Sequence, residues 1–231
     1  DYEGNTWLDF SSQLVNVNIG HQHPAVVDAI KAQADTLTTI APAHANLARG
    51  EAASRILAKA GGHFGAVFFT NGGADANENA IRLARLTTGR DKVLSMYRSY
   101  HGNTGAAIVA TGDWRRQPNE YATGHAHFFG PFAYRSEFWS GSEAEESERA
   151  LQHLRRVIES EGPSTIAALL IETVPGTAGV LAHGHRAIRP PQCGARPGNA
   201  PFPGVDQRRR DRRADHRLQH RARFGEIQVR A

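Results

Sequence analysis

The stretch VFFTNGGADANENAIRLARL, at residues 67–86, decides the fold that the rest of the chain is expected to adopt. An apolar run at residues 66–69 opens it, with the length and aromatic content typical of a buried strand. Gly72 and Gly73 then make a turn, and a segment with helical spacing follows. The side chains expected to face inward are Ala76, Ala80, Leu83 and Thr87, and those expected to face outward are Asp75, Glu78, Arg82 and Arg85.

A strand, a Gly-Gly turn and a helix N-terminus together form an anion-binding arrangement. The first amides of a helix have no partner within the helix, and glycine allows a phosphate to approach them closely. The same residues also fit a plain tight turn between a strand and a helix. This stretch alone supports both interpretations equally, since the nucleotide P-loop and dinucleotide-binding patterns are absent from it.

Composition limits the class of protein. With 231 residues, 40% of them hydrophobic, the chain can bury one sizeable core, and it shows neither a signal peptide nor an apolar run long enough to span a membrane. Cys193 is the single cysteine, which excludes an internal disulfide framework and favours a reducing cytoplasm. The net charge of +4 combines −4 for residues 1–185 with +8 for residues 186–231.

Strand and helix patterns alternate along the chain. The predicted elements are a hairpin at 1–12, helices at 23–38 and 47–60, a strand at 92–96, a short helix ending at 111, an irregular aromatic segment at 112–142, a helix at 143–161 and a strand at 166–171. Apolar strands separated by helices indicate an α/β fold with a mainly parallel sheet covered on both faces.

Ligands of such sheets bind beyond the carboxyl ends of the strands. Three features fall at those ends in this sequence, namely the turn at residues 72–74, the triplet at residues 100–102, and Glu172. Their convergence favours a functional interpretation of the glycine turn over a plain structural one.

The pattern stops near residue 183, where an irregular segment rich in Arg and Pro begins. It fits a disordered basic tail, or a coding frame read out of phase, and the abrupt change favours the second. The expected organisation is therefore an N-terminal segment at 1–45, an α/β domain at 46–182, which the family resemblance described next implies to be a partial cofactor-binding large domain, and the basic tail at 183–231. The chain starts at Asp1 and is expected to be a piece of a longer protein.

Four segments in order resemble the class III (ω-type) pyridoxal-phosphate aminotransferases of fold type I. They are DYEGNTWLDFSSQLVNVNIGHQHPAVVDAI at 1–30, FFTNGGADANENAIRLAR at 68–85, TTGRDKVLSMYRSYHGNTGA at 87–106 and IAALLIETVPGTAG at 166–179. The resemblance covers about residues 1–181 and lies nearer the amine or ω-amino-acid:pyruvate branch. It implies part of a fold type I large domain, pyridoxal 5'-phosphate as the cofactor, amine and keto acid substrates, and a homodimer.

The resemblance also implies a role for individual residues. The amides of Gly73 and Ala74 would hold the cofactor phosphate, Tyr100 would stack on the pyridine ring, His101 and Gly102 would shape that turn, and Glu172 would lie beside the ring face. Leu14 and Val15 would form the floor of the substrate pocket. Trp114 and the other aromatic residues of 112–142 would either line that pocket or cover the sheet, and both interpretations stay open.

The sequence departs from the family pattern at the reacting groups. Neither the Schiff-base lysine nor the aspartate that pairs with the ring nitrogen is found, and the chain's lysines, Lys31, Lys59 and Lys92, fall away from the expected site. No catalytic residue is therefore assigned, and the chain is expected to be inactive. Gly72 replaces a phosphate-binding serine, and Thr177 replaces the second glutamate of ornithine- and GABA-type members, which argues against those two substrates.

Simpler interpretations stand beside these roles. His101 more readily packs locally than acts as a base, and Glu172 also fits a solvated strand end. The pairs at 21/23 and 125/127 lack acidic partners in sequence, so surface or loop histidines are expected and no metal site is assigned. Two further functions compete with the aminotransferase, namely a non-catalytic remnant with a phosphate pocket or dimer surface, and nucleic-acid binding by the basic tail, which ranks last.

Overall fold

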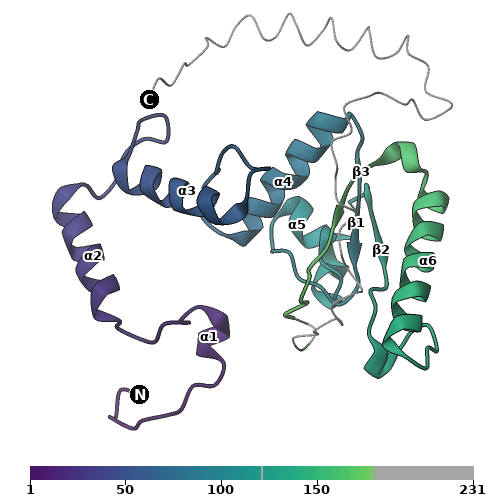
Figure 1. The fold of residues 1–231 in the computed structure, drawn as a ribbon, viewed down its shortest axis with the longest axis horizontal. Coiled ribbons are helices and arrows are strands. Elements are labelled where there is room, and N and C mark those ends of the chain that lie inside the picture. The colour runs from purple at the N-terminus through teal and green to yellow at the C-terminus, as the bar shows by residue number, and fades with distance from the viewer. Residues whose placement is uncertain (121, 178, 180–231) are drawn as a thin grey trace, which may run out of the picture. The chain divides into compact units, whose positions relative to one another are not determined.

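A computed structural model places residues 1–120, 122–177 and 179, and the description below concerns these residues. They divide into two units, one of residues Asp1–Ala76 and one from Asn77 onward (Figure 1). The sequence predictions for the Arg-rich tail at 183–231 lie outside the described residues. None of the described helices combines the length and apolar content that a membrane span requires.

The first unit contains three helices, α1 (Ser12–Val15), α2 (Pro24–Thr36) and α3 (Leu47–Ala60). The predicted helices at 23–38 and 47–60 are therefore confirmed. Pro24 begins α2 at the position where its missing amide hydrogen costs nothing, and Gly61 ends α3 with a φ of 86°. Asn46 caps α3 by accepting a hydrogen bond from the amide of Arg49 at 2.9 Å.

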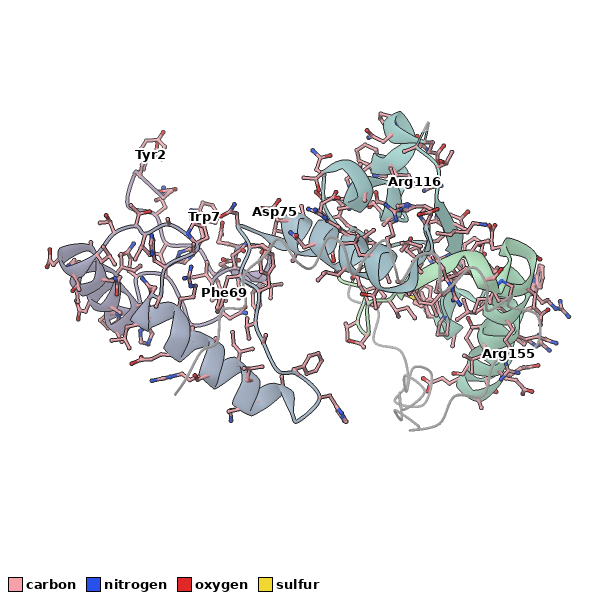
Figure 2. The ribbon with its side chains drawn as sticks, turned by 90° about the horizontal axis from the view of Figure 1, so that it is seen from above. Tyr2, Trp7, Phe69, Asp75, Arg116 and Arg155 are labelled. Atoms are coloured by element: carbon pink, nitrogen blue, oxygen red, sulfur yellow. The ribbon has the colours of Figure 1, made fainter. Side chains whose placement is uncertain are left out.

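Two predictions for the first unit are wrong. Residues 1–4 form a turn, closed by a bond from Gly4 N to Asp1 O, and the predicted hairpin at 1–12 contains no paired strands. Residues 66–69 are likewise not a strand, and Phe68 is 74% exposed. None of residues 1–76 is buried, and the labelled side chains of Tyr2 and Trp7 are exposed (Figure 2). An apolar run becomes a strand only by pairing with a neighbour, and no described strand pairs with this one.

The second unit holds the sheet. Helix α4 (Gly73–Thr88) leads into it, and the elements that follow are β1 (Lys92–Met96), α5 (Gly105–Ala110), η1 (Trp114–Asn119), β2 (His125–Phe128), η2 (Ala133–Arg135), α6 (Glu143–Glu161), η3 (Pro163–Thr165) and β3 (Ile166–Leu170). The predicted elements at 92–96 and 143–161 have these same bounds. The described strands lie in the order β2-β1-β3, and both pairings are parallel, as predicted.

Helices cover both faces of the sheet (Figure 1). On one face Leu94, Met96 and Phe128 pack with Leu154 and Val157 of α6. On the other face Ile81 of α4 and Ala110 of α5 pack against Val93 of β1. The side chains of β1 are almost wholly buried because the strand is central and covered on both sides.

The segment 112–142 is more regular than predicted. Strand β2 lies within it and pairs with β1 from Val93↔His125 to Met96↔Phe128. The four residues HAHF are too short and too polar to show a strand pattern, and pairing with β1 supplies the backbone hydrogen bonds that stabilise them. The prediction of loop or surface histidines at 125 and 127 is therefore wrong, since both lie in β2 and are half-buried.

Helix α4 also presents a different face from the one predicted. Ile81 is its buried residue, whereas Leu83 is 59% exposed. Glu78, predicted to face outward, accepts hydrogen bonds from the hydroxyl of Thr104 at 2.7 Å and from the amide of Ala107 at 2.9 Å. The polar N-terminus of α5 therefore decides which side of α4 faces the sheet unit.

Candidate functional site

The loop that follows β1 is fixed by a close backbone approach. A Cβ atom on Gly112 would lie 2.7 Å from the Cα of Tyr97, so only glycine fits there. Gly112 N bonds to Ser99 O at 3.0 Å, and Arg98 N bonds to Gly112 O at 3.1 Å. The buried hydroxyl of Ser99 donates to Met96 O at 2.6 Å. These contacts hold the start of the loop against the end of β1.

Thr111 and Asn77 hold the rest of the loop. The hydroxyl of Thr111, which is fully buried, accepts from the amide of His101 at 3.1 Å. The carboxamide of Asn77 in α4 donates to the carbonyl of His101 at 2.6 Å. Sequence reasoning missed both residues. Thr111 was visible only as the end of a short helix, and the helical pattern assigned Asn77 to neither face.

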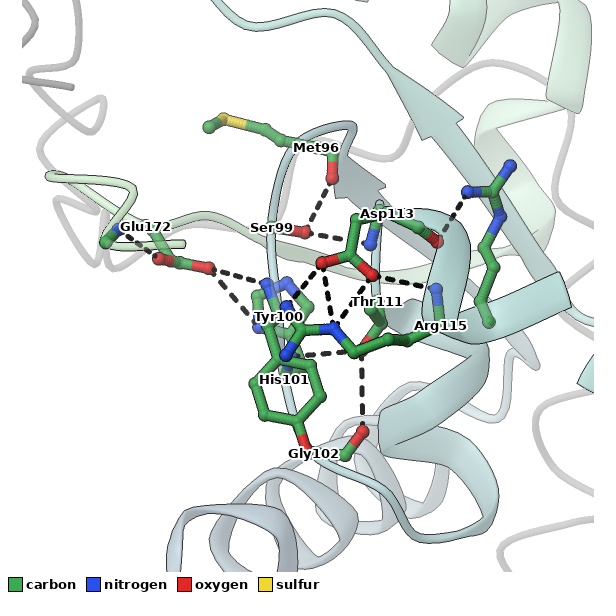
Figure 3. A network of polar contacts seen from close by, with 12 residues as sticks. Met96, Ser99, Tyr100, His101, Gly102, Thr111, Asp113, Arg115 and Glu172 are labelled. Carbon is green, nitrogen blue, oxygen red and sulfur yellow. Dashed lines mark hydrogen bonds and ion pairs between the residues drawn. The ribbon is translucent and has the colours of Figure 1, made fainter. Parts of the chain in front are cut away.

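The structure brings Tyr100 and His101 together with Glu172 (Figure 3). Glu172 Oε1 lies 3.4 Å from the amide nitrogen of Tyr100 and 3.9 Å from His101 Nδ1. Its Oε2 accepts from the amide of Gly176 at 3.2 Å. Glu172 is thus held by main-chain donors at the carboxyl ends of β1 and β3, which are adjacent strands.

His101 is buried, and its Nε2 has no hydrogen-bond partner among the described residues. Burial lowers the pKa of the His101 imidazole, and the negative charge of Glu172 opposes that shift only in part. Because the net direction is downward, the ring is neutral at neutral pH. A neutral imidazole in this position forms no ion pair with Glu172.

A second carboxylate lies close to Tyr100. Asp113 accepts hydrogen bonds from the side chain of Arg115, whose Nε lies 3.1 and 3.0 Å from the two carboxylate oxygens. These bonds lower the pKa of the Asp113 carboxyl despite the opposing effect of burial. The guanidinium of Arg115 lies over the ring of Tyr100, with 3.9 Å from Cζ to the ring centroid (Figure 3). Sequence reasoning singled out neither Asp113 nor Arg115.

The remaining predicted positions lie elsewhere. Gly73 is the first residue of α4 and Ala74 the second, and neither Gly72 nor Gly73 has a positive φ. Leu14 and Val15 lie in α1 and are exposed. Trp114 is 73% exposed, which excludes the interpretation that it covers the sheet.

The paired histidines do not form a metal centre with their neighbours. His21 does have an acidic neighbour, Asp9, at 3.9 Å, contrary to the sequence expectation. His127 Nε2 lies 3.1 Å from the carbonyl oxygen of Thr111. Across the part of the chain that the structure describes, His, Cys, Asp and Glu side chains nowhere gather in a group of three or more suited to a metal ion.

Comparison with solved structures identifies the fold. The structure is similar to that of the taurine:2-oxoglutarate aminotransferase of Bifidobacterium kashiwanohense, solved with pyridoxal phosphate and glutamate. The match covers 80% of this chain, with a TM-score of 0.76 and 43% identity. An ω-aminotransferase of Paracoccus denitrificans matches over 81% of the chain, with a TM-score of 0.74 and 25% identity. The sheet and its helices are therefore part of a fold type I aminotransferase large domain, as predicted.

The family follows from the sequence comparisons. The family model described as aminotransferase class-III matches residues 1–189, and this chain belongs to that family. The acetylornithine aminotransferase of Bacillus subtilis is 35% identical over 180 residues, which make up 78% of this chain and 41% of that protein. The chain likewise spans 43% of the Bifidobacterium enzyme. Pyridoxal phosphate is the cofactor that this family uses.

Proposed function

We propose that this chain is the cofactor-holding part of an aminotransferase that moves an amino group from an amine or ω-amino acid to an α-keto acid such as pyruvate. The observation that carries the proposal is the meeting of Tyr100, His101 and Glu172 at the carboxyl edge of a parallel sheet, in a chain of the class-III family. When bound, pyridoxal phosphate supplies an electron sink for the carbanion at the substrate carbon.

We propose that the residues assigned by the family resemblance form a binding set for the cofactor. In this proposal the amides of Gly73 and Ala74 hold the phosphate, because the first amides of α4 have no acceptor within the helix. Tyr100 would hold the pyridine ring by stacking, and Glu172 would contribute to the same site. His101 and Gly102 shape the turn, in which Gly102 has a φ of 132°.

The same residues do not supply the reacting amine. Lys92 begins β1, at the edge opposite Tyr100, and its Nζ pairs with Glu161 Oε2 at 2.6 Å and Glu161 O at 2.7 Å. Lys31 in α2 and Lys59 in α3 are the other lysines of the sequence. We therefore propose that the chain, in the form given by its sequence, binds the cofactor without catalysing turnover.

The substrate proposal rests on the comparisons and on one sequence position. Since the taurine:2-oxoglutarate aminotransferase is 43% identical to this chain, taurine with 2-oxoglutarate is the first substrate pair to test. Pyruvate with a simple amine is the second. Thr177, in place of the second glutamate of ornithine- and GABA-type members, argues against those donors. Leu14, Val15 and Trp114 remain the candidate substrate contacts, all of them exposed.

The exposed apolar residues of the first unit support a homodimer. The large apolar side chains exposed there include Trp7, Leu8, Phe10, Ile19, Val26 and Ile30. Leaving this much apolar surface in water is unfavourable, and a second copy of the chain would cover it. We place this protein in the cytoplasm, as its single cysteine favours.

Titration of the purified chain with pyridoxal phosphate tests the proposal. We expect saturable binding that is weakened in Tyr100→Ala, and no stoichiometric adduct at any one lysine after borohydride reduction. Absence of binding would contradict the cofactor-holding role. A borohydride-stable adduct at a specific lysine, or a single turnover with taurine or alanine, would contradict the proposed inactivity. Light scattering at increasing concentration tests the dimer.

A further inference from the structure

Among the described residues, the contact between Arg115 and Tyr100 is the closest between a cationic side chain and an aromatic ring. The Cζ atom of Arg115 lies 3.9 Å from the centroid of the Tyr100 ring. Its neighbour Arg116 lies 5.4 Å from the ring of Tyr97, and Arg98 lies 5.4 Å from that of Phe132. A guanidinium at such a short distance from the ring centroid is attracted by the negative face of the ring.

Asp113 fixes the guanidinium in this position. Its two oxygens accept from Arg115 Nε, Oδ2 also accepts from Nη2, and Oδ1 accepts from the main-chain amide of Arg115 at 3.0 Å (Figure 3). Arg115 is therefore bound along one edge, which leaves the flat face of its guanidinium free to contact a ring. The Asp113 side chain is only 16% exposed, so solvent competes little for these bonds.

The orientation of the Tyr100 ring depends on its contact with Arg115. The main chain of Tyr100 is held by Glu172 and by the neighbouring bond from His101 to Thr111. Tyr100 as a residue is 37% exposed, and no aromatic ring among the described residues packs against its ring. Arg115 is thus the described cationic group that contacts the ring and can restrain its orientation.

We propose that Arg115 is a positioning residue, which covers one face of the Tyr100 ring and so presents the opposite face to the pyridine ring of the cofactor. The inference rests on the proposed function. Arg115 would restrict the rotation of the Tyr100 side chain before the cofactor binds. A side chain that is already ordered loses less conformational entropy on binding. If Arg115 instead covered the face that the cofactor needs, removing it would strengthen binding.

The test compares pyridoxal phosphate dissociation constants of the full chain, read from tryptophan fluorescence quenching. We expect Arg115→Gln to weaken binding by about threefold to tenfold. The matched control Arg116→Gln removes the same charge from the same short helix and should leave the constant within about twofold. In a Tyr100→Ala background, Arg115→Gln should cause no further loss, because the residue acts through Tyr100.

A cofactor-free measurement separates this inference from the proposed function. In protein labelled with 3-fluorotyrosine, the ¹⁹F resonance of Tyr100 is identified by its loss in Tyr100→Phe. We expect Arg115→Gln to shift this resonance and Arg116→Gln to leave it in place. An unmoved resonance would overturn the inference, as would tighter or unchanged binding by Arg115→Gln. If the unaltered chain failed to bind pyridoxal phosphate, both the proposed function and the cofactor role of Arg115 would be overturned. The ¹⁹F resonance would still show whether Arg115 contacts the Tyr100 ring.

Discussion

Glu78 Oε1 lies 2.9 Å from the amide nitrogen of Ala107 and accepts its hydrogen bond. The same oxygen accepts from the hydroxyl of Thr104, the residue that precedes α5. A carboxylate from α4 therefore caps the N-terminus of α5, where amides lack partners and the helix dipole favours negative charge. This contact joins the helix that begins at Gly73 to the helix that follows residues 100–102.

Replacement of Glu78 by Ala should lower the free energy of unfolding by about 1–2 kcal/mol, because the amide of Ala107 and the hydroxyl of Thr104 lose their acceptor. Denaturant titration measures the change. The control Arg82→Ala, at an exposed position one turn further along α4, should change it by less than about 0.5 kcal/mol. Equal effects of both substitutions would show that Glu78 does not cap α5.

Replacement of Gly112 by Ala should destabilise the chain by about 1–3 kcal/mol, because the new Cβ would overlap the backbone of Met96 and Tyr97. Since these residues begin the loop that carries Tyr100, pyridoxal phosphate binding should weaken as well. Gly141→Ala is the control, because its Cβ would meet only the flexible side chain of Glu145 at 3.6 Å. Unfolding midpoints and cofactor titrations of both variants check the prediction.

Replacement of Glu146 by Gln should lower the free energy of unfolding by about 2–4 kcal/mol. Glu146 is only 2% exposed, and its carboxylate accepts from the amide of Phe132 and the hydroxyls of Ser136 and Ser140. Burial alone would raise the pKa of this carboxyl, but these bonds and Arg149 outweigh burial, and the pKa lies below its usual value. The amide NH₂ group of a glutamine here is itself a donor, so it could not accept the hydrogen bonds from Phe132, Ser136 and Ser140.

The exposed Glu148, two residues along the same helix, provides the control for Glu146. Glu148→Gln should change the free energy of unfolding by less than about 0.5 kcal/mol. If Glu146→Gln changed the free energy of unfolding as little as Glu148→Gln, the Glu146 carboxylate would not be organising the segment at 131–140. Thermal and urea unfolding at neutral pH distinguish the two results.

The stability should also fall in acid because of His125. Burial, assisted by the charge of Arg85, lowers the pKa of the His125 imidazole from 6.5 to about 4. At a pH between about 4 and 6.5, His125 binds a proton in the unfolded chain but not in the folded chain. The free energy of unfolding therefore decreases as the pH falls from 6.5 towards 4, by an amount on the order of 3 kcal/mol, and His125 adds no dependence above this window.

Urea titrations from pH 8 to pH 4 test this prediction. His125→Gln should reduce the slope of stability against pH in that window, and part of the slope should remain because burial also lowers the pKa of His101, His127 and His153. An unchanged slope would mean that His125 titrates normally in the folded chain.

The elements that sequence predicted well are those whose signals are local. The bounds of α6 follow from Ser142 as a capping residue, an apolar stripe and Gly162. Strand β1 follows from an apolar run between polar residues. In the candidate site, Tyr100, His101 and Glu172 were found because they directly follow strands of a parallel sheet.

The predictions that failed depended on partners distant in sequence. Residues 66–69 and 125–128 are both short, yet only the second segment has a described strand beside it, and only the second is a strand. Arg115 and Asp113 escaped notice because nothing in their sequence indicates that their side chains lie over Tyr100. A ring contact of this kind arises only once β1 and η1 are folded together.

The sequence by itself determined where α3 and α6 begin and end, the parallel arrangement of the strands and the family to which the chain belongs. Capping residues, glycines and apolar spacing act within a few residues and are therefore visible in one chain. The tertiary structure alone decided that Glu78 and Glu146 are enclosed acceptors rather than solvated charges, and that Tyr100 lies beneath a guanidinium. The environment of a polar side chain is set by the donors that the fold brings to it, and those donors come from other elements.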